Sequence, residues 1–460
     1  MFALVRVRVA VRWTLVAQGN HATHARLPQG AALRRRTVLK ALVGLSCALP
    51  FSRGTALARV ADVDDAFLED LSRRSFQYFV DHTGPTGIVR DRARTDGTPS
   101  TPHDAVGSIA ATGFGLTALC IAVERGWMSR SDARERVWRT LETFALEVPP
   151  TRGWFYHYLN VHTGEREWRS EVSSIDTALL VAGVLTAKQA WAADSDIQSL
   201  VTTIVDRLDY QWMLDGHPSL LSHGWYPEVG FIPHRWDDYS ELMILYVLGL
   251  GAAREPLSVA SWRAWQRPPV EYGGYRYVGR VPLFVHQYAH AWIDFRDWRD
   301  PEDPHDWHEN SVRAVRAHRQ FCIDLAPEFP GCYDESVWGI TASDTRSGYR
   351  AWSGPPRTPG IDGTVVPCAA GGSLMFAPDI SLTALHAMKE RFGDRIYGRY
   401  GFADAFHPTS GWVNPDVIGI DVGITLLAAE NLRSGRVWEW FMRNQEVTRG
   451  LERARLAKLA

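Results

Sequence analysis

Hydrophobic residues recur along the chain at the spacing of α-helices, and the helical segments come in pairs of similar length. The segment 108–127 is apolar around most of its circumference, whereas 129–148, SRSDARERVWRTLETFALEV, carries one apolar stripe opposite a charged face. The same contrast separates 173–191, SSIDTALLVAGVLTAKQAW, from 195–214, SDIQSLVTTIVDRLDYQWML. A helix that is apolar all round is typical of an inner layer, and a striped helix is typical of the layer outside it.

The periodicity predicts about twelve helical segments. Their ranges are 64–82, 108–126, 130–147, 173–191, 195–213, 238–251, 258–266, 282–297, 309–325, 379–392, 421–433 and 434–445. A buried helix followed by an amphipathic one, six times over, predicts an all-α fold of the (α/α)6 toroid type, a double ring of helices. A superhelix of stacked repeats is the alternative, but it would require a fixed repeat length, which the chain lacks.

Long loops rich in glycine and aromatic residues interrupt the helical pairs. They cover 152–169, 220–236, 271–280 and 338–367. Loops of this length inside a compact domain are usually functional, and the last could contain a few strands. Aromatic rings in such loops offer flat apolar faces to sugars, while polar neighbours can bond hydroxyl groups. The candidate substrate-binding residues are Trp225, Tyr226, Arg235, Trp236, Asp237, His286, Glu335, Trp338, Tyr349 and Trp352.

The first 58 residues have the composition of a targeting segment. They contain nine Lys or Arg residues and no Asp or Glu. Arg35 and Arg36 precede a short apolar stretch, and 56–58 forms a small-residue cleavage site, which together indicate a twin-arginine export signal. We therefore expect a signal over 1–58, one catalytic domain over 59–460, and a periplasmic or secreted protein. A cytosolic basic tail, or a start codon assigned too far upstream, is the alternative.

Without that segment the chain is acidic, because 41 of its 50 basic residues would remain beside 52 acidic ones. An acidic surface disfavours nucleic acid and anionic membranes as partners. No later segment is apolar enough to span a bilayer, so we expect a soluble monomer with a neutral substrate. Cys120 is interpreted as a buried thiol, and Cys322 and Cys332 could form a disulfide in an oxidising compartment.

The stretch RWDDYSELMILYVLGLG, residues 235–251, places three carboxylates at the start of an apolar run. Asp238 followed by Glu241 fits a capping box at a helix start. A capping box needs only two acids, however, and Asp237 is a third. Like-charge crowding raises a carboxyl pKa by about 1 to 3 pH units, whereas a helix N-terminus favours the anion by only about 0.3 to 1 kcal/mol. One carboxyl should therefore stay protonated near neutral pH, as general-acid catalysis at a glycosidic oxygen requires.

Other acids, at predicted helix starts or in the long loops, are further candidates for the active site. Glu309, in DWHENSVRA, either complements a helix N-terminus or belongs to an active site, and Glu335 lies in an aromatic-rich loop. Asp176, Asp404 and Asp421, at or before helix starts, are interpreted as caps.

HQYAHAWIDFRD places His286, His290 and Asp294 one turn apart on one helical face, which could hold a metal ion. Helical histidines are more often packed or hydrogen-bonded, and no further Cys or His cluster accompanies these, so neither a metal nor a cofactor is expected. The chain also lacks a P-loop, a dinucleotide-binding glycine motif and a serine nucleophile elbow. Phosphoryl transfer, hydride transfer and serine hydrolysis are therefore disfavoured.

Several motifs recur in the order seen in one family. RWDDYSELMILYVLGLG, PLFVHQYAHAWIDFRDWRD, HENSVRA, WGITASDTRSGYRAW, VVPCAAGGSL, GFADAFHP and GIDVGITLLAAENLRSGRVWEWF resemble the bacterial glucoamylase-like domain. That domain includes the endo-β-1,2-glucanases of glycoside hydrolase family 144, and a relative forms part of the cyclic β-1,2-glucan synthases. The resemblance covers 66–445. It implies an (α/α)6 barrel and inverting hydrolysis of a glucan, with functional acids at Asp238, Glu241 and Glu309.

The sequence therefore predicts an exported glycoside hydrolase that cleaves a β-glucan, with β-1,2-glucan favoured, by inversion and without a metal. Glu241 is expected to be the general acid, and Glu309 or Asp238 to position or activate water; the two carboxyls of such a pair lie about 6.5 to 9.5 Å apart. A transferase that cyclises or rearranges glucan chains and a glycan-binding protein without turnover are the alternatives. A polysaccharide lyase is less favoured, because clustered carboxylates would repel an anionic substrate.

Overall fold

The computed structural model describes residues 62–99, 104–301 and 306–458. The predicted export signal, 1–58, and its boundary with the catalytic domain lie outside these residues. Helices dominate the described chain, and its strands are short, with at most four residues each. The predicted helical character is therefore confirmed, with short strands added at the ends of the helices.

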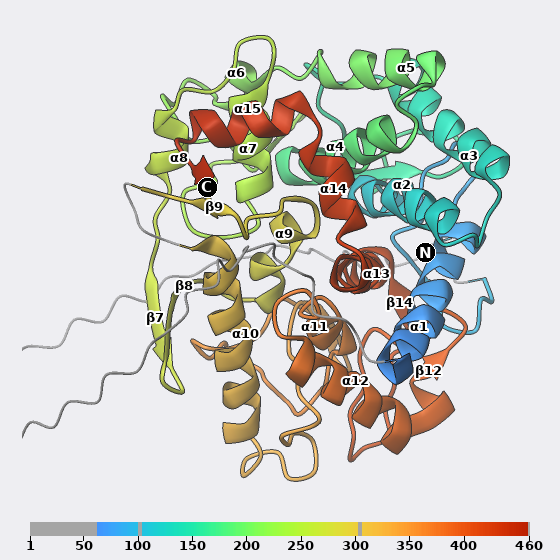
Figure 1. Ribbon diagram of the computed structural model, residues 1–460, viewed down its shortest axis with the longest axis vertical. Coiled ribbons are helices and arrows are strands. Elements are labelled where there is room, and N and C mark those ends of the chain that lie inside the picture. Colours follow the sequence, from blue (N-terminus) through green and yellow to red (C-terminus); the bar gives the residue numbers. More distant parts are fainter. Residues whose placement is uncertain (1–61, 100–103, 302–305, 459–460) are drawn as a thin grey trace, which may run out of the picture. The chain divides into compact units, whose positions relative to one another are not determined.

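The helices and strands follow one another along the described chain as in Figure 1. The α-helices are α1 (Asp62–Asp81), α2 (Ile109–Glu124), α3 (Arg130–Glu142), α4 (Ser174–Ala190), α5 (Ser195–Val205), α6 (Tyr210–Met213), α7 (Met243–Gly251), α8 (Ala260–Ala264), α9 (Tyr288–Trp292), α10 (Trp307–Asp324), α11 (Pro367–Gly371), α12 (Pro378–Phe392), α13 (Gly419–Arg433), α14 (Arg436–Met442) and α15 (Gln445–Arg453). The other helical turns are η1 (Thr143–Glu147), η2 (Leu283–His286) and η3 (Gly393–Arg395). The strands are β1 (Arg92–Arg94), β2 (Val106–Ser108), β3 (Tyr158–Asn160), β4 (Val172–Ser173), β5 (Gly224–Tyr226), β6 (Gly230–Phe231), β7 (Pro269–Tyr272), β8 (Tyr275–Val278), β9 (Trp298–Arg299), β10 (Ser343–Thr345), β11 (Gly348–Arg350), β12 (Tyr397–Gly398), β13 (Gly401–Phe402), β14 (Asp416–Ile418) and β15 (Ala457–Lys458).

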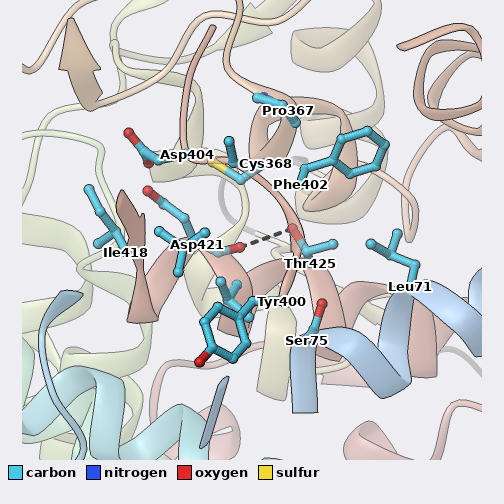
Figure 2. A pocket seen from close by; sticks show the side chains of 13 residues that line it. Leu71, Ser75, Pro367, Cys368, Tyr400, Phe402, Asp404, Ile418, Asp421 and Thr425 are labelled. Atoms are coloured by element: carbon cyan, nitrogen blue, oxygen red, sulfur yellow. Dashed lines mark hydrogen bonds between the residues drawn. The ribbon is translucent and has the colours of Figure 1, made fainter. Parts of the chain in front are cut away.

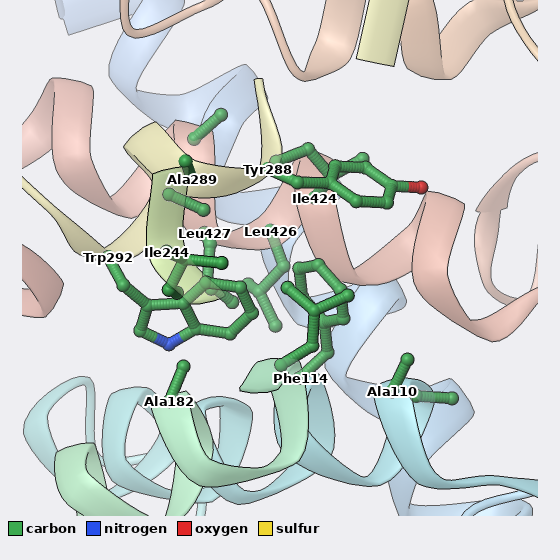
Figure 3. Packing of buried hydrophobic residues seen from close by; sticks show 14 of the residues in the cluster. Ala110, Phe114, Ala182, Ile244, Tyr288, Ala289, Trp292, Ile424, Leu426 and Leu427 are labelled. Carbon is green, nitrogen blue, oxygen red and sulfur yellow. The ribbon is translucent and has the colours of Figure 1, made fainter. Parts of the chain in front are cut away.

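Five largely buried helices, α2, α4, α7, α9 and α13, share the apolar core. Figure 3 shows Phe114 of α2, Trp292 of α9 and Leu426 of α13 converging there. α2 and α4 approach so closely that a Cβ atom on Gly113 would lie 2.2 Å from the carbonyl oxygen of Leu179. Glycine permits this approach because it has no side chain, and the two backbones therefore pack directly against each other.

Amphipathic helices cover these inner helices from outside. α3 packs on α2 and α5, α5 packs on α4, α1 packs on α13, and α15 packs on α7. The side chain of Ser129 caps α3 by accepting the N–H of Asp132, and Asp194 caps α5 in the same way. The alternation of buried and amphipathic helices predicted from the sequence is therefore present in this part of the chain.

Short strands join the N-terminal ends of the inner helices to the long loops. Ser108 of β2 pairs with Tyr158 of β3, and Ser173 of β4 pairs with β5. Ser108 and Ser173 are also the N-caps of α2 and α4. Arg92 of β1 pairs with Ile418, the residue before α13. The starts of three inner helices therefore lie beside loop residues, and polar side chains from both can meet there.

Some predicted helices are shorter or divided. The segment 282–297 contains only η2 and α9 as helices, so His286, His290 and Asp294 do not share one continuous helical face. The geometric argument for a metal at these residues is therefore wrong. The segment 195–213 is divided into α5 and α6, and α11 was not predicted. The hairpin of β10 and β11 confirms that the loop 338–367 contains strands.

The four cysteines of the described chain are free and buried, so Cys322 and Cys332 are not paired. The Sγ atom of Cys322 lies 3.6 Å from His318 Nε2, and that of Cys332 lies 3.6 Å from Thr409 Oγ1. Cys120 is a buried thiol, as predicted. Among the described helices, none combines the length and the apolar character needed to cross a membrane.

Candidate active site

Glu241 lies two residues before α7 and does not belong to a capping box. α7 begins at Met243, and its N-cap, Leu242, makes no side-chain hydrogen bond to the helix. The Oδ1 atom of Asp238 accepts the N–H of the next residue, Tyr239, at 3.0 Å. The capping-box interpretation of Asp238 and Glu241 is therefore wrong, and neither carboxyl is needed to start the helix.

The environment of Glu241 favours its protonated form. The side chain is half-buried, and burial is the main cause that raises its pKa to about 7. The carboxylate of Asp176 raises this pKa further, because two like charges oppose ionisation. Glu241 therefore retains its proton into the neutral range, and a carboxyl in this state can act as a general acid.

Asp176 belongs to a charged trio with His157 and Glu171. His157 Nδ1 lies 2.9 Å from Glu171 Oε1, and Nε2 lies 3.6 Å from Asp176 Oδ1. Burial lowers the pKa of His157, but the two acids outweigh it and raise the pKa to about 9. The ligand atoms of the trio lie within 4.8 Å of one another and could hold a metal ion. Since the imidazole holds a proton between the acids, a metal would have to displace that proton.

The hydroxyls of Ser173 and Tyr226 complete the bonding of this trio. Ser173 donates to Asp176 Oδ2 at 2.5 Å and accepts the N–H of the same residue, so Asp176 is also the second member of the α4 cap. Tyr226 of β5 donates to Glu171 at 3.4 Å. Burial raises the pKa of Asp176, whereas for Glu171 the bond and charge of His157 outweigh burial and lower the pKa.

A pair of buried carboxyls, Asp404 and Asp421, lies at the start of α13. Asp421 is in the first turn of that helix, and Asp404 follows β13 by two residues. Together with Cys368 they line a cavity of ≈ 20 Å³, room for about one water molecule (Figure 2). Burial raises the pKa of both carboxyls above the ordinary value, and the charge of Asp421 raises that of Asp404 further.

Arg92 and Asn414 connect the pair to two more acids. The Arg92 guanidinium lies 3.3 Å from Asp91 and 2.8 Å from Asp344. Asn414 Nδ2 donates to both Asp344 and Asp404 at 3.1 Å. We call the carboxyls that act on one another around these helix starts the acidic cluster. Its members are Asp91, Glu171, Asp176, Glu241, Asp344, Asp404 and Asp421.

Tyr288 of α9 links Glu241 to Asp421 across this cluster. Burial raises the pKa of its hydroxyl, and the charges of Asp421 and Glu241 both raise it further. Figure 3 shows the hydroxyl of Tyr288 pointing away from the apolar core. The charges of Glu241, from the segment before α7, and of Asp421, from the first turn of α13, therefore both act on the hydroxyl of Tyr288.

Asp238 and Glu309, the predicted partners of the general acid, are held in ion pairs. Asp238 Oδ2 accepts a hydrogen bond from Arg280 at 2.5 Å, and Glu309 Oε1 accepts one from Arg313 at 2.9 Å. The Glu309 side chain is 45% exposed. Its bond to Arg313 is a helical pair four residues apart, so the alternative interpretation, a charge at a solvent-facing helix start, fits its contacts well.

The motifs DDYSE and HENS nevertheless pack against each other. The ring of Tyr239 stacks on Trp307, with 6.0 Å between the ring centroids. The Tyr239 hydroxyl also lies 3.0 Å from Nδ1 of His286. Burial lowers the pKa of His286 to about 3, and the side chain is 2% exposed. The predicted substrate contact of His286 is therefore not supported, because its imidazole is packed in the interior.

The predicted aromatic platform divides into core and surface. Trp338, Trp352 and Trp236 are buried; the Trp236 indole donates to Ser174 Oγ at 2.8 Å. These three residues belong to the apolar core, so the structure does not support the substrate contacts predicted for them. Tyr349, on β11, is 54% exposed over the whole residue. Desolvation of its hydroxyl and the charges of Asp421, Asp404 and Asp91 raise its pKa.

The remaining predicted contacts have different environments. Trp225 and Tyr226 of β5 are half-buried, and Tyr226 reaches the trio through Glu171. Arg235 donates to the carbonyl oxygens of two loop residues, Leu214 and Leu220, and so holds the loop in shape. Asp237 and Glu335 are exposed, and neither carboxyl acts on the pKa of Glu241.

Several members of the acidic cluster were not predicted as site residues. Asp404 was interpreted as a cap but lies in a loop after β13, so that interpretation is wrong. Asp421 lies in the first turn of α13 but makes no cap bond. Glu171 and Asp91 of the cluster, and His157 of the charged trio, had no assigned role. Each of these residues precedes an inner helix or pairs with the strand before one. This position along the chain is the sequence feature that could have marked them as site residues.

Comparisons with known proteins agree with the motifs. Residues 233–445 match the family model Glycoamylase, described as "Putative glucoamylase". A curated relative from Parabacteroides distasonis, named exo β-1,2-glucooligosaccharide sophorohydrolase (non-reducing end), is 25% identical over an alignment of 438 residues that covers 86% of this chain. The chain spans 58% of the length of that relative. The resemblance to the glucoamylase-like domain is therefore confirmed.

Solved structures extend the similarity to the fold. An endo-β-1,2-glucanase from Chitinophaga pinensis, in complex with sophorotriose and glucose, is 25% identical with a TM-score of 0.80, over 86% of this chain and 99% of the other. An endo-β-1,2-glucanase from Talaromyces funiculosus, in complex with sophorose, is 14% identical with a TM-score of 0.63, over 85% and 90%. The second is similar in fold alone.

Proposed function

We propose that this protein is a glycoside hydrolase that cleaves β-1,2-glucan with inversion at the anomeric carbon. The names of the similar bacterial enzymes and the family match support the substrate and the reaction class. In this proposal the inner and outer helices form an (α/α)6 toroid, as the alternation of buried and amphipathic helices suggests. The acidic cluster then lies at the end of the toroid where the inner helices begin.

The observation that carries the proposal is the raised pKa of Glu241 within the acidic cluster. Glu241 protonates the glycosidic oxygen while the bond from that oxygen to the anomeric carbon breaks. Asp421 accepts a proton from the water that attacks the anomeric carbon on the opposite face. An inverting pair needs space for this water, and the proposal is supported by the charges of Glu241 and Asp421, which both act on the hydroxyl of Tyr288.

The half-buried polar groups near Glu241 supply the contacts for sugar hydroxyls. The trio of His157, Glu171 and Asp176 offers both donors and acceptors, since its side chains keep 14 to 25% of their exposure. Tyr349 and Trp225 offer aromatic faces to the sugar rings. A neutral glucan suits this site, whereas a uronate would be repelled by the carboxylates.

The test is turnover of β-1,2-glucan with the anomeric configuration of the first product followed by NMR. Wild type should release the inverted anomer. Glu241→Gln and Asp421→Asn should each lose about 10² to 10⁴ in kcat, the usual contribution of a general acid or base. Retained configuration would rule out inversion, and longer or cyclic products with excess acceptor would indicate a transferase.

Two matched control variants test whether Asp421, rather than Glu309 or Asp238, is the base that activates water. Glu309→Gln and Asp238→Asn remove one charge each from ion pairs with arginines, as Asp421→Asn removes one from the acidic cluster. Both should keep kcat within about tenfold of wild type, because exposed ion pairs contribute little. A loss at Glu309 or Asp238 as large as that at Asp421 would return the role of base to that residue.

Export is a separate part of the proposal and rests on the sequence of residues 1–58. A twin-arginine signal requires the pair Arg35 and Arg36. Replacement of both arginines by lysine should retain the protein in the cytoplasm, as measured by cell fractionation. Unchanged export of this variant would contradict the assignment.

A further inference from the structure

The two carboxyls of Asp404 and Asp421 line the same small cavity. They are 4% and 7% exposed, and Figure 2 shows them on the same side of the cavity beside Cys368. Two neighbouring carboxylates cannot both ionise in such a place without a large electrostatic cost. One of the two must therefore hold a proton, and the geometry identifies which one.

The oxygens of Asp404 differ sharply in their partners. Oδ2 accepts the backbone N–H of Asp344 at 3.0 Å and the amide of Asn414 at 3.1 Å. Oδ1 is buried and has no hydrogen-bond donor among the described residues. A buried carboxylate oxygen without a donor is costly. A proton on Oδ1 removes this cost, because the resulting O–H can donate to Asp421.

Asp421 is better placed to carry the negative charge. It lies in the first turn of α13, where free N–H groups and the helix dipole favour an anion. The N-cap of this helix, Ile418, has no side-chain acceptor, so no cap competes for that positive end. The thiol of Cys368 also donates a hydrogen bond to Asp421, which lowers the pKa of this carboxyl against the effect of burial.

We propose that Asp404 is a positioning residue that stays protonated and donates a hydrogen bond to Asp421, so that Asp421 remains the carboxylate that accepts the proton of the attacking water. The assignment of a base at Asp421 rests on the proposed function, but the protonated state of Asp404 does not. The other titratable and charged groups that face the pair are Asp91, Arg92, Asp344, Cys368, Tyr288 and Tyr349.

The first experiment compares three variants by kinetics on β-1,2-glucan: two amide substitutions and one apolar substitution. Asparagine reproduces a protonated aspartic acid, with its amide in place of the O–H group. Asp404→Leu should lose activity, Asp404→Asn should restore it to within about tenfold of wild type, and Asp421→Asn should lose about 10² to 10⁴ in kcat. The reverse order, with Asp404→Asn inactive and Asp421→Asn active, would overturn the proposal, and so would the loss of activity in both folded variants.

The pH profile adds a measurement that a merely structural role would not affect. Without the donated hydrogen bond the carboxylate of Asp421 is less stabilised, so its pKa should rise. The acidic limb of kcat/KM in Asp404→Leu should therefore move to higher pH, and that of Asp404→Asn should stay at the wild-type position. An unmoved limb in Asp404→Leu would contradict the hydrogen bond to Asp421.

The second experiment needs no substrate, so it separates this inference from the proposed function. Infrared spectra at pH 8 should show the carbonyl band of a buried carboxylic acid in Glu241→Gln, a background that removes the proton of Glu241. The band should disappear in the double variant Glu241→Gln, Asp404→Asn and persist when Asp344→Asn replaces the second change. A band that survives Asp404→Asn would overturn the proposal, even if wild type hydrolyses the glucan.

Discussion

Replacement of Glu241 by glutamine is expected to stabilise the fold increasingly as the pH rises, while it removes turnover. The pKa of Glu241 is raised from 4.5 to about 7, chiefly by burial. Between these values the unfolded chain releases this proton and the folded chain retains it. The wild-type protein therefore loses folding free energy as the pH rises from 4.5 through 7, and a glutamine, which cannot ionise, does not.

The magnitude follows from the two pKa values of Glu241. One pH unit of difference corresponds to about 1.4 kcal/mol. The cost of holding the proton is about 1 kcal/mol at pH 5 and about 3 kcal/mol at pH 7.5. The free energy of unfolding of Glu241→Gln, relative to wild type, should thus grow by about 2 kcal/mol between these two pH values.

Urea unfolding followed by tryptophan fluorescence measures this difference at pH 5, 6, 7 and 7.5. Glu309→Gln is the matched control, because it makes the same chemical change at a 45% exposed carboxylate paired with Arg313. Its effect should stay within about 1 kcal/mol at every pH. A difference for Glu241→Gln that does not grow with pH, or one that grows equally in the control, would refute the reasoning from burial.

Three further predictions concern pH, packing and the charged trio. The kcat/KM of wild type should fall as the pH rises through about 7, where Glu241 loses its proton. It should also fall on acidification, as Asp421 becomes protonated. A pH-rate profile on β-1,2-glucan measures both limbs, and a flat profile from pH 5 to 8 would contradict the assignment of this acid and base. Gly113→Ala should lower the free energy of unfolding by about 1 to 3 kcal/mol, because its Cβ would meet the neighbouring helix, whereas Gly398→Ala, which has open space, should change it far less in the same urea titration. The pKa of His157 is raised from 6.5 to about 9, so the wild-type protein should lose stability as the pH rises from 6.5 through 9. Thermal unfolding of His157→Gln should show a smaller loss of stability over this pH range. An equal loss in both proteins would contradict the ion pairs of the trio.

The sequence was sufficient to predict the helical layers because burial and periodicity act locally. The inner helix α2 is apolar on nearly every side, and α3 carries a stripe, so each pattern reports its own surroundings. The importance of Glu241 also followed from the sequence, since three acids are more than a cap can use. The cause assigned to its raised pKa was only partly right: burial dominates, and the crowding charge comes from Asp176 rather than from the adjacent acids.

The remainder of the site could not be predicted because it joins distant segments. Asp404 and Asp421 meet across a loop, and Asp176 approaches Glu241 only after α4 and α7 have packed. In the sequence, an acid at a helix start looks the same whether it caps the helix or faces a substrate. Asp176 belongs both to the cap of α4 and to the charged trio, since Ser173 bonds one carboxylate oxygen and His157 lies beside the other.

The inner helix starts also explain how so many carboxyls can be gathered in one place with different protonation states. Asp176 and Asp421 lie in the first turns of α4 and α13, where the helix dipole favours the anion and partly offsets the cost of burial. Glu241 lies two residues outside α7, beyond the first turn, where this effect has fallen off. Burial therefore outweighs the backbone hydrogen bond that lowers the pKa of Glu241. Glu241 and Asp404, which both lie outside the helices, are the carboxyls expected to keep their protons.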